Sequence, residues 1–249
     1  MSTRPKPIDR WYPERRIGGF THADDTVAFF SRINSVLEPS MVLLDLGCGR
    51  GAALEDPVPW RRQLRIFKGR CALVIGVDPD PAAATNPTID EFHLIVDGRL
   101  PLSNETVDLC IADFVLEHVE DVDAFMAECS RVVKPGGYVF VRTPNVWSYP
   151  VVASRIVPNR LHARALRRLQ PNRKEEDVFP TLYRCNSREK LRRTLERHGF
   201  DCVVRAHESE PGYLGFSRPL YALGVVYQRY APQALRSVLM AFAVKRPAR

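Results

Sequence analysis

The chain has 249 residues, of which 45% are hydrophobic, and its formal net charge is +7. This size predicts one globular domain with an elaboration, and no stretch approaches the roughly 18 consecutive apolar residues of a membrane span. The charged, proline-rich start is unlike a secretory signal peptide, and the six scattered cysteines form no metal-type pair. We therefore expect a cytoplasmic protein with reduced thiols and no metal site.

Apolar runs and turn signals predict strands separated by helices. After a helix that starts near Thr21 and stops at Pro39, the expected strands are, in chain order, 41–46, 72–77, 92–96, 107–112, 138–143, 202–207 and 237–244. An amphipathic helix is expected over 122–133. Another helix is expected to open at a capping-box pair, Asn186 with Glu189, and to end at Gly199. The alternation predicts βαβ units and a mainly parallel sheet.

Two segments depart from this alternation. After Pro144 the pattern lapses for about forty residues, a length that usually serves a function inside a compact domain. We expect a helix there, around His162–Leu169. The amphipathic stretch Leu214–Tyr230 is expected to pack against the sheet, and a membrane-facing role is the alternative.

The positive charge is concentrated in one part of the chain. Between Arg155 and Arg193 there are twelve lysines and arginines against four acidic residues. Such a cluster indicates an anionic partner such as a phosphate group, a lipid headgroup or a nucleic acid. A solvated helical face is the alternative, and the composition does not decide between the two.

The most informative stretch, residues 41–51, reads Met-Val-Leu-Leu-Asp-Leu-Gly-Cys-Gly-Arg-Gly. Its apolar half predicts a buried strand, and Gly47, Gly49 and Gly51 predict a sharp turn that a ligand approaches closely. Asp45 places a carboxylate at the end of the strand, which suits a cationic ligand group and suits a pyrophosphate poorly. The glycines alone also fit a looser dinucleotide pattern. A nicotinamide oxidoreductase thus stays open, although no clear catalytic Lys/Tyr pair is present.

This stretch resembles motif I of the class I S-adenosylmethionine-dependent methyltransferases. Within that family the chain looks most like the small-molecule group related to the ubiquinone-biosynthesis methyltransferases. The resemblance implies a Rossmann-like, doubly wound α/β fold, with a seven-stranded sheet of order 3-2-1-4-5-7-6, an antiparallel strand 7 and a helical insertion after strand 5. Residues 1–40 would then be an N-terminal arm and helix, and residues 41–249 the methyltransferase domain, in which 147–184 is a basic substrate-side insertion.

The resemblance also implies S-adenosyl-L-methionine as the cofactor and a set of residues that hold it. Asp45 would lie near the ammonium, the glycine loop under the methionine end, and Asp78 at both ribose hydroxyls. Asp97 would accept from the adenine amino group, while Gly98 leaves room for the ring. A plain turn is the alternative at Asp78 and at Asp97–Gly98. The expected cofactor-binding residues are Asp45, Gly47, Cys48, Gly49, Gly51, Asp78, Pro79, Asp97, Gly98, Asp113 and Phe114.

His118 is the candidate catalytic residue. It follows the motif of the fourth strand, and its imidazole could accept a proton from a substrate hydroxyl as the nucleophile forms. Alternatively, it orders the loop or contacts Asp113. No N-P-P-Y-type sequence follows the fourth strand, which disfavours methylation of base amines. We expect methyl transfer to a hydroxyl, rather than to a carbon or amine, of a small-molecule, glycan or lipid-linked acceptor.

Two alternatives keep the same cofactor. An RNA methyltransferase would use the basic insertion, and a catalytically silent protein would bind S-adenosylmethionine without reaction. Nucleic acid is the less favoured partner, and peripheral membrane contact stays open. Trp147, Tyr149, Phe179 and Tyr183, set among arginines, fit an amphipathic, anionic acceptor.

Overall fold

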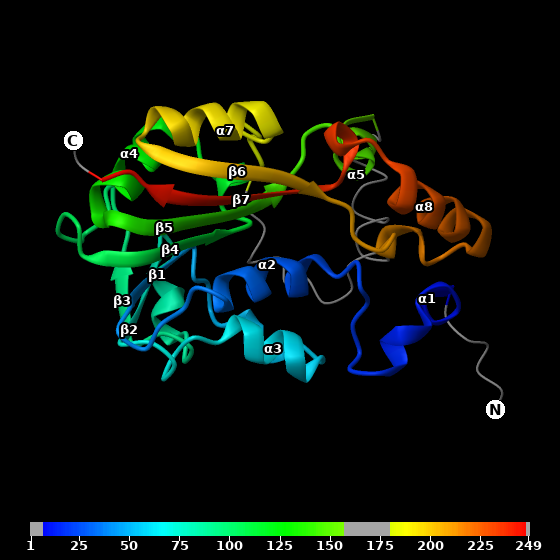
Figure 1. Ribbon diagram of the computed structural model, residues 1–249, viewed down its shortest axis with the longest axis horizontal. Coiled ribbons are helices and arrows are strands. Elements are labelled where there is room, and N and C mark those ends of the chain that lie inside the picture. The colour runs from blue at the N-terminus through cyan, green and yellow to red at the C-terminus, as the bar shows by residue number, and fades with distance from the viewer. Residues whose placement is uncertain (1–6, 157–179, 248–249) are drawn as a thin grey trace.

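Seven strands form one sheet in the computed structural model, which describes residues 7–156 and 180–247 (Figure 1). The strands are β1 (Val42–Leu46), β2 (Leu73–Asp78), β3 (Glu91–Leu94), β4 (Val107–Asp113), β5 (Val133–Pro144), β6 (Phe200–His207) and β7 (Val238–Lys245). The helices are α1 (Pro7–Trp11), α2 (Asp25–Asn34), α3 (Pro59–Arg65), α4 (Val122–Val132), α5 (Tyr149–Ile156), α7 (Arg188–Arg197) and α8 (Arg218–Tyr230). Short 3₁₀ helices include η1 (Pro13–Arg16), η2 (Ala52–Glu55), η3 (Pro81–Thr85), η4 (Leu116–His118), η6 (Gly212–Leu214) and η7 (Gln233–Leu235).

The strand order is β3-β2-β1-β4-β5-β7-β6. The first five strands pair in parallel, whereas β7 is antiparallel to both β5 and β6. Asp45 on β1 lies opposite Gly76 of β2 and Ile111 of β4. The carboxyl ends of the central strands therefore meet at one edge of the sheet, where open α/β sheets bind ligands. The predicted fold class and strand order are confirmed.

Helices cover both faces of the sheet, so the core has two layers (Figure 1). On one face α4 and α7 bury Met126 and Leu191 against Val141 and its neighbours on the central strands. On the other face, α2 packs Phe29 and Ile33, with α3 beside it. None of the described helices is long and apolar enough to cross a membrane.

The helix expected from near Thr21 begins at Asp25, and the capping box expected for a later helix does not form. The Asp24 side chain caps α2 by accepting from the Val27 amide at 2.9 Å. The capping box expected at Asn186 is wrong. Ser187 is the N-cap of α7, without a side-chain cap bond, and Asn186 is buried. Its amide instead donates to Oγ1 of Thr143 on β5 at 2.6 Å.

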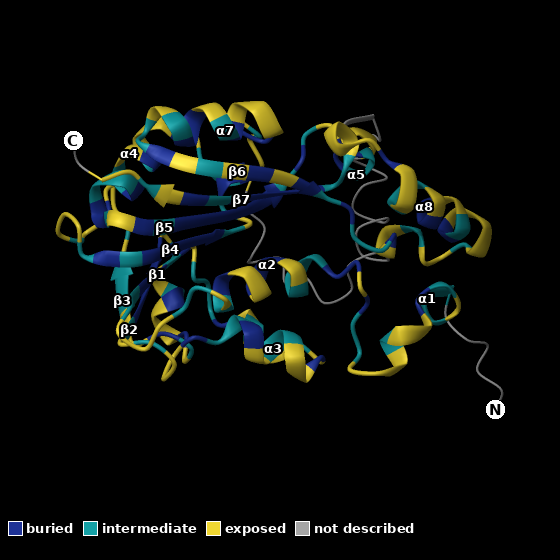
Figure 2. Cartoon of the chain, in the orientation of Figure 1, coloured by how far each residue is buried: buried dark blue, intermediate teal, exposed yellow. Residues whose placement is uncertain are grey.

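Helix α8 does not pack against the sheet, contrary to expectation. It lies at one end of the molecule (Figure 2), where Tyr221 and Val225 pack with Tyr12 of the N-terminal arm and with Trp11 of α1. Amphipathicity predicts that one face of a helix is buried, but not which element covers it. The helix expected around His162–Leu169 lies outside the described residues.

The insertion after β5 leaves the sheet and returns to it at one place. The Val146 amide donates to the Asn186 carbonyl at 2.8 Å, which joins the two ends of the intervening segment. The Asn145 side-chain amide donates to the carbonyls of Ala234 and Arg236, each at 2.8 Å. Both ends of the insertion are therefore anchored to the sheet and to the approach to β7.

The packing of α7 gives a direct test of the core. Leu191 is fully buried, so Leu191→Ala should leave a cavity and lower the free energy of unfolding by about 2–5 kcal/mol. Lys190→Ala, an exposed change on the same helix, should have little effect. Equal denaturant midpoints for the two variants would show that α7 is not part of the cooperative core.

Candidate active site

The loop after β1 has all three motif glycines in the left-handed region, with φ of 68°, 53° and 86° at Gly47, Gly49 and Gly51. A Cβ at Gly47 would lie 2.5 Å from Val115, and one at Gly51 would lie 2.8 Å from Asn86. A Cβ at Gly49 would meet nothing within 4 Å. The protein's own packing therefore requires two of the glycines. Of the three, Gly49 opens onto space that a ligand could fill, and the close approach of a ligand to Gly47 and Gly51 stays a prediction.

Asp78, at the end of β2, holds this loop in place. Its Oδ2 accepts from the Gly49 amide at 3.0 Å, and its Oδ1 accepts from the Asp80 amide at 2.9 Å. Asp78 thus orders the turn through Pro79, as expected from the alternative in which Asp78 starts a plain turn. Each carboxylate oxygen retains a second lone pair, so a ribose contact stays compatible with this geometry. The Cys48 carbonyl is fixed from the other side by the Asn86 amide at 2.9 Å.

Asp45 is the electrostatic centre of the site. Its half-buried carboxyl has no hydrogen bond or ion pair with any residue in the described part of the chain. Burial raises the pKa of Asp45 to about 7, the negative charges of Asp113 and Asp78 add to this rise, and the positive charge of Arg65 offsets part of it. An unpaired carboxyl in an acidic surrounding favours a cationic partner, which would pull it into its ionised form.

Asp113 does not point freely toward a ligand, because Arg142 holds it. The Arg142 side chain is 4% exposed, and it donates from Nε and Nη2 to the two oxygens of Asp113 at 2.6 and 2.9 Å. Its Nη1 donates to Asp25 at 3.1 Å and to Thr26 at 3.0 Å. The guanidinium carbon lies 4.7 Å from the centre of the Phe114 ring. These contacts, which we call the Arg142 clamp, therefore join β4, β5 and α2 beside the site.

Sequence reasoning missed Arg142, although a signal was present. It is a charged residue near the end of the otherwise apolar run Tyr138–Thr143, and a buried charge needs partners. Phe114, which follows Asp113, has a φ of 56° and remains 38% exposed. An exposed aromatic ring held by a buried cation is a suitable wall for a ligand pocket.

Asp97 and Gly98 lie in a tight turn. Both have positive φ, 54° and 71°, and the Arg99 amide donates to the Val96 carbonyl at 3.2 Å. Both residues are exposed. The turn alternative thus describes their backbone, and the adenine contact stays a prediction.

His118 ends η4, directly after the β4 motif. Its Nδ1 lies 2.8 Å from the Pro180 carbonyl. A carbonyl can only accept, so Nδ1 carries the proton and the neutral ring has its lone pair on Nε2. The amides of Leu182 and Tyr183 donate to the Glu117 carbonyl at 2.7 and 3.2 Å. The returning end of the insertion therefore lies against η4 and orients the imidazole.

A buried chain of hydrogen bonds connects η4 to strand β5. Asn186 donates to Thr143 Oγ1, and this hydroxyl donates to Glu117 Oε2 at 2.8 Å. Burial raises the pKa of the Glu117 carboxyl above its ordinary value. Thr143 was not singled out from sequence, and Asn186 was singled out only as a capping residue, because their pairing depends on neighbours that are far apart along the chain.

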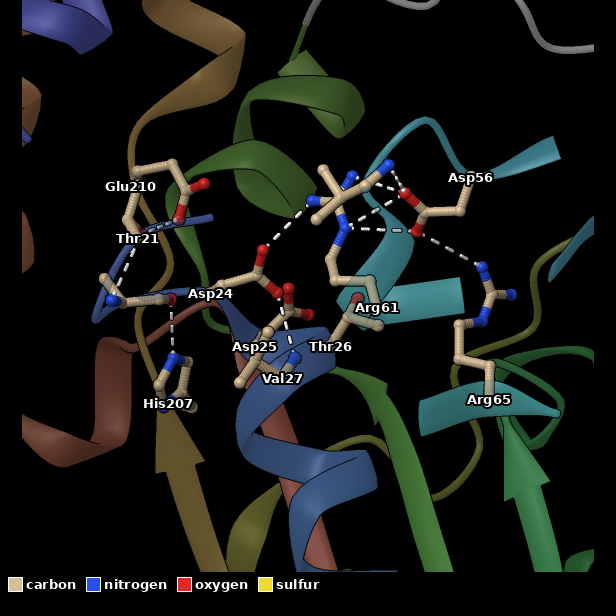
Figure 3. Close-up of polar contacts among 12 residues, drawn as sticks. Thr21, Asp24, Asp25, Thr26, Val27, Asp56, Arg61, Arg65, His207 and Glu210 are labelled. Carbon is tan, nitrogen blue, oxygen red and sulfur yellow. Dashed lines mark hydrogen bonds and ion pairs between the residues drawn. The ribbon is translucent and has the colours of Figure 1, made fainter. Parts of the chain in front are cut away.

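The amino end of α2 is fixed by ion pairs to α3 (Figure 3). Arg61 donates to Asp24 at 3.0 Å and to Asp56 at 2.8 Å. On the other side, His207 Nε2 on β6 lies 2.9 Å from the Ala23 carbonyl. These contacts set α2 beside the carboxyl ends of the strands, so that Asp25 can reach the clamp.

A hollow of about 760 Å³ lies at the opposite edge of the sheet. Its charged side chains are paired with neighbours: Arg131 with Glu128 at 2.7 Å, and Lys245 with Glu105 at 3.3 Å. No group of three or more metal-ligating side chains gathers anywhere in the described residues. Neither feature competes with the site at the ends of β1, β2 and β4.

The strand order, the glycine loop and the lone carboxylate together define a class I S-adenosylmethionine-dependent methyltransferase fold. Residues 16–204 match the family described as "Methyltransferase domain", and the chain belongs to that family. S-adenosyl-L-methionine is accordingly the cofactor. The residues present suit it, because Gly49 leaves open space and Asp45 offers an unpaired carboxylate to a cation.

The curated relatives that match this chain are named as methyltransferases. The chain is 31% identical over 142 residues to the ubiquinone biosynthesis O-methyltransferase of Rhizobium etli. The aligned region covers 56% of this chain and 55% of that protein. It is 36% identical over 110 residues to the enzyme of the same name from a Bradyrhizobium species, covering 41% and 40%. The match thus spans about half of the length of these relatives.

Solved structures share the fold at low identity. A SAM-dependent methyltransferase from Archaeoglobus fulgidus has a TM-score of 0.55 and 18% identity, over 93% of this chain and 97% of that one. Phosphoethanolamine N-methyltransferase 2 of Haemonchus contortus, solved with S-adenosyl-L-methionine, has a TM-score of 0.53 and 15% identity, over 89% and 52%. These likenesses concern the fold alone.

The open space at Gly49 predicts a selective loss of cofactor binding. Gly49→Val should weaken S-adenosylhomocysteine binding by about tenfold or more, because the side chain fills the ligand's space. Gly69→Val is the matched control, since Gly69 also has positive φ and an unobstructed Cβ direction, and both changes carry similar backbone strain. Calorimetry that finds equal affinities for the two variants would refute the close approach at Gly49.

The raised pKa of Asp45 predicts a pH-dependent affinity. Below about pH 7 the free carboxyl is largely protonated, and it must lose that proton before it can pair with a ligand cation. Affinity for S-adenosylhomocysteine should therefore fall by up to about tenfold per pH unit below this value, and level off above it. Asp45→Asn should bind weakly without this slope. A slope that persists in the variant would assign the titration to another group.

Proposed function

We propose that this chain transfers the methyl group of S-adenosylmethionine to a hydroxyl group of a small-molecule acceptor, with His118 as the general base. The observation that carries the proposal is the bond from His118 Nδ1 to the Pro180 carbonyl at 2.8 Å. It leaves the lone pair of the neutral imidazole on Nε2, where a base needs it. The O-methyltransferase names of the curated relatives support a hydroxyl as the methylated group.

When bound, the cofactor supplies a methyl group that is already activated on a sulfonium. The chain's own residues then have three tasks: to hold the donor, to align the acceptor oxygen and to accept its proton. Alignment depends on η4, which the Glu117–Thr143–Asn186 chain and the returning insertion hold in place. His118 would take the proton of the acceptor hydroxyl as the oxygen–methyl bond forms and the bond between the methyl group and the sulfonium sulfur breaks.

The cofactor contacts proposed for this chain follow the site geometry. Asp45 pairs with the ammonium, and Gly49 lies under the methionine end. Asp78 uses its remaining lone pairs for the ribose hydroxyls. Asp97, with the open turn at Gly98, is assigned to the adenine end. Asp113 is assigned a positioning role, because its oxygens are bound by Arg142, and the Phe114 ring faces the donor.

The acceptor side is proposed to lie between the N-terminal arm, 1–40, and the insertion, 147–184, of the methyltransferase domain. Of the insertion, the structure describes 147–156 and 180–184. Trp147 is 60% exposed at its start, which supports an aromatic or apolar acceptor. Half of the basic residues counted from the sequence fall outside the described residues, and no described contact favours an RNA acceptor.

Two substitutions at His118 separate a base from an ordering residue. Asparagine can place an amide N–H near the position of Nδ1 and keep the bond to Pro180, but it offers no basic nitrogen. Both His118→Asn and His118→Ala should therefore lower kcat by about 100-fold or more while S-adenosylhomocysteine affinity stays unchanged. His22→Asn, at an exposed histidine paired with Glu14, is the control.

The assay would follow S-adenosylhomocysteine release with a panel of phenolic, catecholic and aliphatic hydroxyl compounds. Turnover restored by His118→Asn but not by His118→Ala would assign His118 to ordering the loop. Turnover with amine acceptors, and with none of the hydroxyl compounds, would reject the hydroxyl as the group that is methylated.

A further inference from the structure

Helix α8 presents a continuous apolar face to solvent. Leu223 is 64% exposed and Tyr230 is 79% exposed, and Leu220 and Val226 are also exposed. At 100° per residue these four side chains fall within an arc of about 120°. Phe216, just before the helix, extends this face and is 72% exposed. Single exposed apolar residues are ordinary, but a contiguous face of this kind marks an interaction surface.

The opposite side of α8 is packed against the rest of the protein. Tyr221 and Val225 are buried against Tyr12 of the N-terminal arm. On the α5 side, Tyr227 packs edge-on against Tyr149, with ring centres 5.3 Å apart. The helix is therefore fixed in the fold by one side, and its exposed apolar face is a feature of the folded protein.

The charge around this face is of one sign. From Gly212 to Ser237, the stretch that contains α8, the sequence has three arginines, at 218, 229 and 236, and no acidic residue. Arg218 and Arg229 are both exposed. They lie about three turns apart, on the same border of the apolar arc. In the adjacent arm, Asp9 is paired with Arg15 at 3.1 Å and Glu14 with His22 at 2.8 Å.

We propose that the outer face of α8, with Phe216, docks onto an anionic lipid surface. Such a surface offers an apolar layer for the leucines and phosphate groups for the bordering arginines. Aromatic residues at both ends, Phe216 and Tyr230, suit the interface between chains and headgroups. Pairing of this face with a second copy would bring arginines together without an acidic residue between 212 and 249 to neutralise them.

The position of α8 places this contact near the active site. Helix α5 follows the carboxyl end of β5 and touches α8 through Tyr149 and Tyr227, and α8 lies beyond that end of the sheet (Figure 1). Docking would hold the site close to the membrane surface. The lipid contact does not depend on which group the enzyme methylates.

Co-sedimentation of the full chain with vesicles tests the proposal. The protein should bind vesicles of phosphatidylcholine with phosphatidylglycerol more tightly than phosphatidylcholine alone, and salt should weaken the difference. The double change Phe216→Glu and Leu223→Glu should weaken binding by about tenfold or more. The matched control is Val203→Glu, at a 57% exposed apolar residue on the edge strand β6, which should bind like the wild type. Arg218→Gln with Arg229→Gln should remove the preference for anionic vesicles.

Melting curves would confirm that each variant is folded before binding is compared. Absence of vesicle binding by the wild-type chain would overturn the proposal. So would equal binding by the Phe216/Leu223 variant and the Val203 variant. A wild-type dimer in sedimentation equilibrium that the Phe216/Leu223 variant lacks, without vesicle binding, would assign the face to a second copy instead.

Discussion

A single buried guanidinium holds the active-site edge of the sheet together. Burial alone would lower the pKa of Arg142, but the attraction of Asp113 and Asp25 raises it above its ordinary value, so the charge stays on the side chain. Its ion pairs join β4, β5 and α2, and the rings of Phe29 and Phe114 flank it. Such a charge is costly unless every partner is in place. The ends of β4 and β5, and with them the start of η4, therefore depend on the correct docking of α2.

The same clamp explains why the site can hold a cation. Arg142 neutralises Asp113, but Asp45 is left without a partner in the described structure, with Asp78 nearby. The uncompensated carboxyl group thus lies at the end of β1, beside Gly49, which is the motif glycine that faces open space. A dinucleotide site would present helix N–H groups and little negative charge at this point. The balance of charges separates two families whose glycine patterns overlap.

The sequence was sufficient for the strands and for the central motif, because buried strands are continuous apolar runs bounded by turns. The order of the strands came from the resemblance, since hydrophobic periodicity does not fix which strands are neighbours. The errors have a common cause in tertiary contacts. Asn186 has the identity of a capping residue, but it bonds to Thr143 across the core. Amphipathicity indicated that α8 buries one side, but the covering element is the N-terminal arm. His118 was found from its place after the β4 motif, whereas its orientation depends on Pro180, 62 residues away.

The bond between Val146 and Asn186 makes the insertion a closed loop on a stem. Changing the length of such a loop adds little closure entropy once its ends are joined. The part of the segment that precedes its returning end at 180–184 can then be lengthened in evolution while the sheet and η4 keep their contacts. Variation in this loop is thereby separated from the packing of the sheet, which can stay unchanged among descendants of one scaffold.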